Sequence, residues 1–256
     1  MMLKEQRKRK IITLIEVENQ VNINELAEGF DVSEMTIRRD LEELDQDGLI
    51  QRIHGGAIAI QETPKIIELP LLERSNEQAV EKRQIAKKVA GMVKEGEKIF
   101  LGSGTTTIAI AEELKDNKNL TVLTNAVTIV NTLIHAPQIT LIVLGGFLRR
   151  TEMSMIGHFT EAALANLQVD KVIIGIRGID LEHGLTSDNL QELITDQAIL
   201  NISQNIIVAA DHTKFGHVAT IRTAPITRAS IIVTDDKTPQ KMAYDIEQLG
   251  VKVIIA

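Results

Sequence analysis

Two stretches of this sequence carry side chains that bind phosphate groups in proteins. The first places Thr36, Arg38 and Arg39 close together and is followed by Arg52. Arginine contacts the phosphates of nucleic acids and also reads guanine through two hydrogen bonds. The second is the glycine-rich run 102–107, GSGTTT, in which glycines let the backbone approach an anion while hydroxyls add donors. These residue types predict two separate phosphate-binding functions.

The first stretch lies in a segment with the pattern of two short helices joined by a tight turn. Leu26 and Phe30 lie on one face of the first helix, and Asp31 interrupts it. Ser33 is a favourable N-cap for the second helix, because its hydroxyl can accept hydrogen bonds from free N–H groups there. Gly48 is expected to end that helix. The predicted apolar positions of the second helix are Met35, Ile37, Leu41 and Leu44.

A small hairpin is predicted after the second helix, from residues 49–53 and 57–60, with three polar or glycine residues at its tip. A short helix packed across a second one, with cationic and hydroxyl side chains facing outward, fits the major groove of DNA. Together these elements predict a winged helix-turn-helix domain that binds double-stranded operator DNA. The predicted DNA-contacting residues are Ser33, Thr36, Arg38, Arg39, Arg52, His54, Gly55 and Gly56.

The composition agrees with a folded protein that carries a net negative charge. Hydrophobic residues make up 44% of the 256 residues, cysteine is absent, and the formal net charge is −7. The lack of cysteine excludes disulfides and thiolate metal sites, and no apolar run approaches the roughly 18 residues of a membrane span. The charged N-terminus does not resemble a secretory signal. We therefore expect a cytoplasmic protein without metal or cofactor, whose basic run 4–10 contacts phosphates or, alternatively, forms a solvated helix face.

The second part of the chain alternates short apolar runs with helical segments, which predicts a mostly parallel α/β sheet covered on both faces. The predicted strands are 98–101, 121–124, 140–144, 171–176, 205–210, 230–234 and 252–255. The predicted helices are 76–93, 106–114, 126–134, 160–167, 189–202 and 239–249. The predicted domains are 1–60 for DNA binding, 61–74 for a linker with two prolines, and 75–256 for the α/β domain.

Glycines and polar residues follow five consecutive predicted strands, and parallel sheets bind ligands beyond the carboxyl ends of their strands. The run 102–107 lacks the lysine of a Walker A loop and the third glycine of a dinucleotide fingerprint, so a small phosphate ester fits it better than a nucleotide. A plain strand-to-helix turn is the alternative for this run, and a capping role is the alternative for Asp211. The predicted effector-binding residues are Gly102, Ser103, Gly104, Thr105, Thr106, Thr107, Thr124, Asn125, Gly145, Gly146, Arg177, Asp180, Asp211 and Lys214.

The same residues resemble a known family. The run 32–57, VSEMTIRRDLEELDQDGLIQRIHGGA, and the later runs EKRQIA, GSGTTT and ADHTKFG resemble DeoR-type bacterial transcriptional regulators over nearly the whole chain. The resemblance implies a winged helix followed by a sugar-phosphate-sensing domain similar in fold to ribose-5-phosphate isomerase and glucosamine-6-phosphate deaminase. It also implies that the run 102–107 holds the phosphate of the effector. The residues that it places at the sugar end are Thr124, Asn125, Asp180, Asp211 and Lys214.

Two residues depart from the commoner pattern of that family. Many members carry a lysine about where Asp196 stands, and a small residue often precedes the second glycine where this chain has Arg177. If both side chains face the pocket, we expect an effector that differs from that of typical members, with Arg177 bound to a carboxylate or a second phosphate. In the alternative, Arg177 and Asp196 pair with each other or with solvent.

The leading hypothesis is a repressor of a carbohydrate-metabolism operon whose operator affinity changes when a phosphorylated sugar binds the second domain. Because the operator of a helix-turn-helix protein is usually a repeat, we expect a homodimer or a higher homo-oligomer. One alternative is a sugar-phosphate isomerase or deaminase fused to a DNA-binding module, with Asp180, Asp211 and Lys214 as acid–base groups. Another is a scaffold whose second domain only oligomerises.

Overall fold

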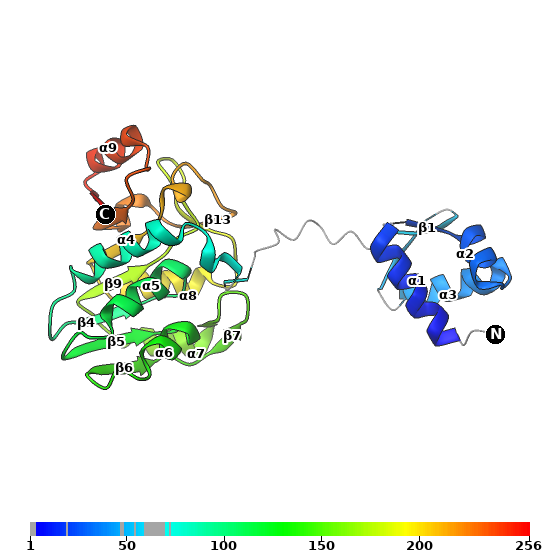
Figure 1. The fold of residues 1–256 in the computed structure, drawn as a ribbon, viewed down its shortest axis with the longest axis horizontal. Helices are drawn as coiled ribbons and strands as arrows, with labels where there is room; N and C mark the ends of the chain where they lie inside the picture. The colour runs from blue at the N-terminus through cyan, green and yellow to red at the C-terminus, as the bar shows by residue number, and fades with distance from the viewer. Residues whose placement is uncertain (1–3, 19, 47–48, 54, 59–69, 72) are drawn as a thin grey trace. The chain divides into compact units, whose positions relative to one another are not determined.

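The computed structural model of the chain describes residues 4–18, 20–46, 49–53, 55–58, 70–71 and 73–256. The chain divides into two compact units, Met1–Ile67 and Glu68–Ala256, and both are drawn in Figure 1. Most of the predicted linker 61–74 lies outside the described residues, so the predicted domain boundaries stay a prediction. No helix in the described part of the chain is long and apolar enough to cross a membrane.

The first unit contains three helices and a three-stranded antiparallel sheet. The helices are α1 (Lys4–Glu18), α2 (Ile23–Phe30) and α3 (Glu34–Gln46), and the strands are β1 (Gln20–Asn22), β2 (Gln51–Ile53) and β3 (Gly56–Ile58). The predicted helix-turn-helix is confirmed as α2 and α3, and Asp31 ends α2 in the left-handed conformation, with φ 53°. The hairpin is confirmed as β2 and β3. The sheet order β1-β3-β2 adds a strand that the sequence pattern does not predict. Gly48 and residues 59–60 lie outside the described residues.

The core of this unit buries one face of each helix. Its largest fully buried side chains are Ile11, Ile15, Ile37, Leu41, Leu44 and Ile50. Ile37, Leu41 and Leu44 are four and three residues apart, so they share one face of α3. The prediction that Met35 belongs to this face is wrong, because Met35 is 71% exposed. A residue two positions before Ile37 lies about 200° around the helix, which places it on the opposite side.

The second unit is built around a seven-stranded sheet in which all neighbouring strands are parallel (Figure 1). In spatial order its strands are β15 (Lys252–Ile255), β14 (Ile231–Thr234), β12 (Ile206–Ala209), β9 (Lys171–Ile174), β4 (Lys98–Leu101), β5 (Leu120–Thr124) and β6 (Ile139–Val143). All seven lie at predicted strand positions, so the predicted parallel α/β sheet is confirmed. The chain runs from β4 to β5 and β6 on one side, and β9 then begins the other side. The edge between β4 and β9 is therefore a topological switch point, where such sheets bind ligands.

Helices cover both faces of this sheet. They are α4 (Ala79–Ala90), α5 (Thr105–Leu114), α6 (Val127–Leu133), α7 (His158–Leu164), α8 (Leu193–Asn201) and α9 (Gln240–Gln248). The first three bury apolar side chains with Ile99 and Ile173 of the sheet. The last three belong to a separate cluster that contains Phe100 and Val172. Because successive residues of a strand point to opposite faces, the two clusters are the two sides of the sheet, as predicted.

Shorter elements that the sequence pattern does not predict also belong to this unit. The strands β10 (Gly178–Asp180), β11 (Gly184–Ser187) and β13 (Ile221–Ala224) form an antiparallel sheet, and β7 (Phe147–Arg149) and β8 (Ser154–Ile156) form a hairpin. The 3-10 helices are η1 (Glu73–Asn76), η2 (His212–Lys214) and η3 (Ile226–Arg228). Elements of three or four residues are too short to show a period in the sequence.

Candidate functional site

The outer face of α3 carries side chains predicted to contact DNA. Arg38 and Arg39 are exposed, and Thr36 is half-buried. Ser33 caps the helix as predicted, because its Oγ accepts a hydrogen bond from the Thr36 N–H at 3.2 Å. Arg38 Nη2 lies 3.4 Å from Glu34 Oε2, one turn earlier in the helix. Arg39 has no ion-pair partner among the described residues, so its guanidinium is available to a ligand.

Three cations of the basic run 4–10 pair with carboxylates of α3. Arg7 is 7% exposed, and its Nε donates to Asp40 Oδ2 at 2.5 Å. Lys4 and Lys8 both donate to the carboxylate of Glu43, at 2.6 and 3.2 Å. These pairs join α1 to α3. The expectation that this run contacts phosphates is therefore wrong for Arg7, whose charge is used inside the unit.

The wing gives its two glycines different roles. Gly55 is exposed and has a φ of +93°, a conformation that favours glycine. Gly56 is buried, and a Cβ at this position would lie 1.9 Å from the Val21 carbonyl oxygen on β1. Gly56 is therefore required for the packing of β3 against β1. Arg52 is exposed on β2, and His54 lies outside the described residues. Contact of the wing with DNA stays a prediction.

A cavity of about 140 Å³ lies at the carboxyl edge of the parallel sheet. Residues that follow β4, β5, β9 and β12 line it, together with residues of α4, α8 and η1. The sheet thus brings strand ends that are distant in the sequence around one space, at the switch point between β4 and β9. The predicted effector-binding residues that line it are Gly102, Ser103, Gly104, Thr105, Thr106, Asn125, Arg177, Asp211 and Lys214.

The glycine-rich run forms one wall of this cavity at the start of α5. Gly104 has a φ of +136°, which lets the chain turn from β4 into the helix. Ser103 and Thr105 line the cavity at the helix N-terminus. There the first N–H groups have no carbonyl partner within the helix and the helix dipole is positive, which favours a bound phosphate. The Thr107 hydroxyl instead donates to the Gly104 carbonyl oxygen at 2.8 Å, and Thr107 does not line the cavity.

Two lysines add positive charge to the same cavity. Lys82 of α4 lines it, and its Nζ donates to the Arg74 carbonyl oxygen at 3.2 Å. Lys214 of η2 lines it from the loop after β12 and is half-buried. Burial lowers the pKa of Lys82, while the nearby Asp211 carboxylate raises it. An anion in the cavity would stabilise the protonated lysines, since opposite charges favour the ionised form.

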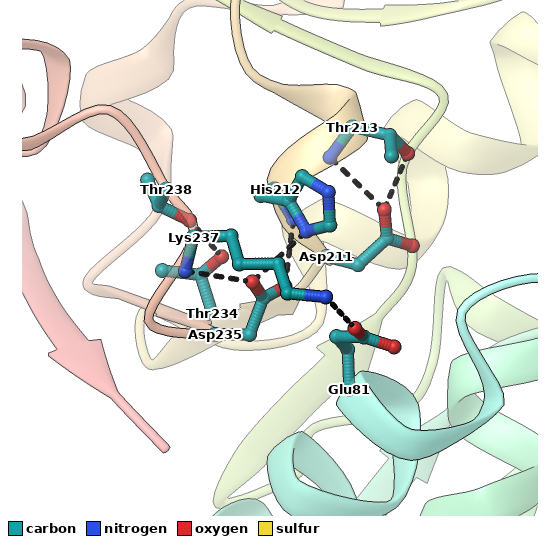
Figure 2. A network of polar contacts seen from close by, with 8 residues as sticks. All are labelled: Glu81, Asp211, His212, Thr213, Thr234, Asp235, Lys237 and Thr238. Carbon is teal, nitrogen blue, oxygen red and sulfur yellow. Dashed lines mark hydrogen bonds and ion pairs between the residues drawn. The ribbon is translucent and has the colours of Figure 1, made fainter.

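A polar network holds the loop that carries Asp211 and Lys214 (Figure 2). The fully buried Asp235 carboxylate accepts hydrogen bonds from the backbone N–H and from Nδ1 of His212, at 2.8 and 2.9 Å. Asp211 Oδ1 accepts the Thr213 N–H at 3.0 Å and so caps η2. Asp211 therefore has the capping role considered from its sequence, and it also lines the cavity.

The same network reaches α4. In Figure 2 Glu81 of α4 points toward Lys237, whose Nζ lies 2.5 Å from Glu81 Oε1. This hydrogen bond lowers the pKa of Glu81 and raises the pKa of Lys237. Lys82, the next residue of the helix, lines the cavity.

Two of the predicted effector-binding residues have structural roles away from the cavity. Thr124 Oγ1 donates to the Leu101 carbonyl oxygen at 2.7 Å and accepts the Ala126 N–H at 3.0 Å, which fixes the turn after β5. Asp180 Oδ1 accepts the His183 N–H at 2.8 Å in the turn between β10 and β11. This hydrogen bond lowers the pKa of Asp180. Neither residue lines the cavity.

The predicted glycine pair after β6 also lies outside the cavity. Gly145 and Gly146 are exposed in the loop between β6 and β7. A Cβ on Gly146 would lie 2.2 Å from Thr160 Oγ1 and 2.7 Å from the Ile156 carbonyl oxygen. Gly146 thus permits close packing of this loop against α7, and effector contact by either glycine stays a prediction without support from this cavity.

Charged side chains form another wall of the cavity. The sequence pattern does not predict that these side chains lie together. Glu152, from the turn between β7 and β8, pairs with Arg74 and, at 2.5 Å, with Arg177. Arg149 Nη1 lies 2.9 Å from Glu192 Oε1. Arg177 lines the cavity and pairs with Glu152, and no described ion pair joins it to Asp196, the partner considered from the sequence. The described residues contain no group of His, Cys, Asp or Glu arranged to hold a metal ion.

Asp196 of α8 also lines the cavity beside this cluster. Burial raises the pKa of Asp196 well above its usual value, and the nearby Glu192 carboxylate raises it further, against the opposing charge of Arg149. Burial also raises the pKa of Glu192. In the described part of the chain no hydrogen-bond donor contacts the Asp196 carboxylate. Its ionised form is therefore destabilised in the folded protein.

Replacing Asp196 with asparagine is expected to stabilise the second unit near neutral pH. Because folding raises the pKa of Asp196, the native state binds a proton more tightly than the unfolded state, and stability falls as the pH rises from the ordinary carboxyl pKa through the raised value. An amide does not ionise, so we expect a Tm higher by about 2–4 °C near neutral pH and little gain near about pH 4. Thermal unfolding at the two pH values, followed by circular dichroism, measures both changes in Tm.

The matched control for this substitution is Asp180→Asn. The pKa of Asp180 is lowered in the folded protein, so its carboxylate is stabilised there and its removal is not expected to raise the Tm. An equal gain from Asp196→Asn at both pH values, or a lower Tm near neutral pH, would contradict the assigned cause.

Both units match sequence families. The DeoR-like helix-turn-helix domain matches residues 7–63, and the DeoR C terminal sensor domain matches residues 77–236. The glycerol-3-phosphate regulon repressor of Escherichia coli (strain K12) is 36% identical over 234 residues, which cover 91% of this chain and 92% of that protein. The transcriptional repressor AccR of Agrobacterium fabrum is 34% identical over 252 residues, which cover 98% of this chain and 96% of that protein.

Solved structures resemble the chain more distantly. Ribose 5 phosphate isomerase A from Neisseria gonorrhoeae is 17% identical, covers 52% of both chains and has a TM-score of 0.39. The two sequence relatives are repressors that match nearly the whole chain, and they do not support the alternative of an isomerase or a deaminase. The helix-turn-helix with its wing and the parallel sheet with a cavity at its carboxyl edge agree with the family matches over both units. These matches show that this chain belongs to the DeoR family of DNA-binding transcriptional regulators.

Proposed function

We propose that this regulator represses a carbohydrate-metabolism operon and that a phosphorylated sugar controls its affinity for operator DNA. The observation that carries the proposal is the cavity at the carboxyl edge of the sheet. There the start of α5 offers free N–H groups, while Lys82 and Lys214 add positive charge. A relative named for the glycerol-3-phosphate regulon supports a small phosphate ester as the effector.

On the DNA side, α3 enters the major groove of the operator. Arg38 and Arg39 are exposed on this helix and carry the charge for phosphate contacts or guanine readout, while Thr36 lies beside them. Arg52 and Gly55 of the wing contact the backbone next to the groove. The protein acts in the cytoplasm, where its operator is, and requires no cofactor or metal.

The regulator works as a homodimer or a higher homo-oligomer. A helix-turn-helix protein reads an operator made of two half-sites, and two copies of α3 satisfy that repeat. Effector and operator then change each other's affinity by the same factor, which for proteins of this kind corresponds to about 1–3 kcal/mol.

Fluorescence anisotropy of the full-length protein on DNA from upstream of its own gene tests this function. The titration is run at two salt concentrations, with and without a panel of sugar phosphates. Binding is expected to weaken steeply with salt, because each neutralised phosphate releases counterions, and to shift with one member of the panel. Specific binding that no sugar phosphate alters would contradict the role of the cavity. Absence of specific binding would contradict the role of α3.

Replacing Lys214 with methionine is expected to weaken effector binding by about tenfold or more. The side chain keeps its length but loses a charge-assisted hydrogen bond to phosphate, of about 1.5–3 kcal/mol. DNA binding without effector is expected to stay unchanged. Calorimetry with the sugar phosphate found in the panel measures the loss, and Lys252→Met, at an exposed lysine on β15, is the control. Equal affinities of Lys214→Met and the natural protein would show that Lys214 does not contact the effector.

A further inference from the structure

The seven-stranded sheet ends in two outer strands, β6 and β15, and neither outer edge pairs with another described strand (Figure 1). Such an edge presents backbone N–H and C=O groups that can pair with a further strand. β15 begins with the exposed Lys252, and a charged side chain on an edge strand opposes such pairing. β6 has the sequence ITLIV and carries no charge, so its edge lacks this protection.

Both faces of β6 expose apolar side chains at its carboxyl end. Ile142 and Val143 are 40% and 49% exposed. Because successive residues of a strand point to opposite faces of a sheet, the described elements leave both faces partly uncovered there. A partner that docked on one face would bury only one of these side chains. A further strand at the edge, together with the elements that cover its own sheet, would bury both.

Two aromatic side chains are exposed on the elements that follow this strand. Phe147 of β7 and Phe159 of α7 are 66% and 67% exposed, and their ring centroids lie 6.1 Å apart. The run 139–148 contains no charged residue, although charged residues make up 25% of the chain. Clustered apolar side chains of this kind mark interaction sites on protein surfaces. We define the β6 surface as the exposed residues Ile142, Val143, Phe147, Leu148 and Phe159.

The lack of charge in the run 139–148 favours a second copy of this chain as the partner. Two copies repel each other at long range, because each has a formal net charge of −7. In a twofold interface the same surface meets itself, so a charge near the axis would face its own like charge. An uncharged strand avoids this repulsion. When it pairs antiparallel with its own copy, one residue lies opposite itself and both open edges are paired at once.

We propose that β6 pairs antiparallel with the β6 of a second copy, and that the β6 surface is the dimer interface of the second unit. The two parallel sheets then join into one continuous sheet. Phe147 and Phe159 of each copy are buried against the other copy. This inference rests on the proposed function, because it names the surface through which the proposed homodimer forms.

Sedimentation velocity of the full-length protein tests this interface with Ile142→Lys. The matched control is Ile255→Lys, at an exposed isoleucine of the other outer strand. Ile142→Lys is expected to weaken dimerisation at least about a hundredfold, since it brings two desolvated like charges into one interface. Ile255→Lys is expected to leave dimerisation unchanged. Circular dichroism of both variants checks that the second unit stays folded.

The absence of cysteine from this chain allows a second measurement that introduces no charge. A single cysteine replaces each residue of 139–143 in turn, and Ile255→Cys is the control. A disulfide requires Cα atoms about 4.4–6.8 Å apart, so only a residue that lies opposite itself links two copies. Disulfide-linked dimers are expected to peak at one residue of β6 after mild oxidation and to be absent from Ile255→Cys.

Three results would overturn the proposal. If the protein is dimeric, Ile142→Lys leaves it so, and no cysteine of β6 links more than Ile255→Cys, the homodimer forms through another surface. Dissociation by Ile142→Lys without a link at any residue of β6 would contradict the antiparallel pairing. If the natural protein binds operator only as a monomer, the homo-oligomer of the proposed function fails, and this inference fails with it.

Discussion

Replacing Asp40 with alanine is expected to destabilise the DNA-binding unit by about 3–5 kcal/mol, because the substitution breaks a buried ion pair. Arg7 Nε donates to Asp40 Oδ2 at 2.5 Å, and the two side chains are only 8% and 2% exposed. Without the carboxylate, the Arg7 guanidinium stays buried without its partner, and α1 loses its buried ion pair with α3. Hydrogen exchange of the full-length protein measures this loss as amides of α1 and α3 that exchange about 150-fold to several thousandfold faster.

Two controls separate this effect from a general loss of charge. Lys4→Ala removes an exposed pair with Glu43, which is expected to contribute less than about 1 kcal/mol. The double substitution of Arg7 by methionine and Asp40 by leucine removes both buried charges, and it is expected to recover most of the lost stability. If Asp40→Ala had no larger effect than Lys4→Ala, the pair would not hold the unit together, and Arg7 would be available to DNA.

Replacing Arg39 with alanine is expected to weaken operator binding by about 1–3 kcal/mol, which is roughly a fivefold to 150-fold loss. Arg39 is exposed on α3, and the described structure gives it no ion-pair partner. Within the described residues its charge is unpaired, and its removal is expected to leave stability nearly unchanged. Anisotropy titrations at several salt concentrations measure the loss. They also show its origin, because a lost phosphate contact lowers the salt dependence, whereas a lost base contact relaxes the sequence preference.

The neighbouring arginine provides the comparison for Arg39. Arg38 lies 3.4 Å from Glu34 on the exposed side of the helix, and exposed pairs of this kind contribute little to stability. Arg38→Ala therefore tests a second cation of α3 without a cost to folding, and Lys252→Ala removes a charge from the other unit. If Arg39→Ala bound operator as tightly as Lys252→Ala, α3 would not present Arg39 to DNA.

The DNA-binding unit shows which features of a fold follow from local sequence. The burial of Ile37, Leu41 and Leu44 and the cap at Ser33 depend on residues within about one turn of each other, so their spacing is sufficient to predict them. The prediction that Met35 is buried was wrong for a reason that is also local, because its position around the helix is incompatible with the buried face. The burial of Arg7 is different, because it depends on Asp40 from another helix.

In the second unit, as in the first, features that depend on neighbouring residues were predictable, and features that depend on distant segments were not. The seven parallel strands were predictable because a strand buried on both faces is a continuous apolar run bounded by turns. The turn at 102–107 from a strand into a helix was predictable because its glycines act through their own backbone and the helix that follows, and anion binding there stays a prediction. The short antiparallel strands were not predictable, because their pairing partners lie in other segments and the strands are too short to show a period in the sequence.

The sequence by itself determined the main helices and strands of this protein and identified two stretches predicted to bind phosphate, because each follows from contacts between near neighbours in the chain. Only the tertiary structure decided which side chains share the cavity. Glu152 from a hairpin turn, Arg74 from η1 and Asp196 from α8 meet there because β9 returns beside β4 and packs these segments around one edge. Charges from distant segments interact through space, so their pairing and the burial that raises the pKa of Asp196 depend on that packing and not on their spacing in the sequence.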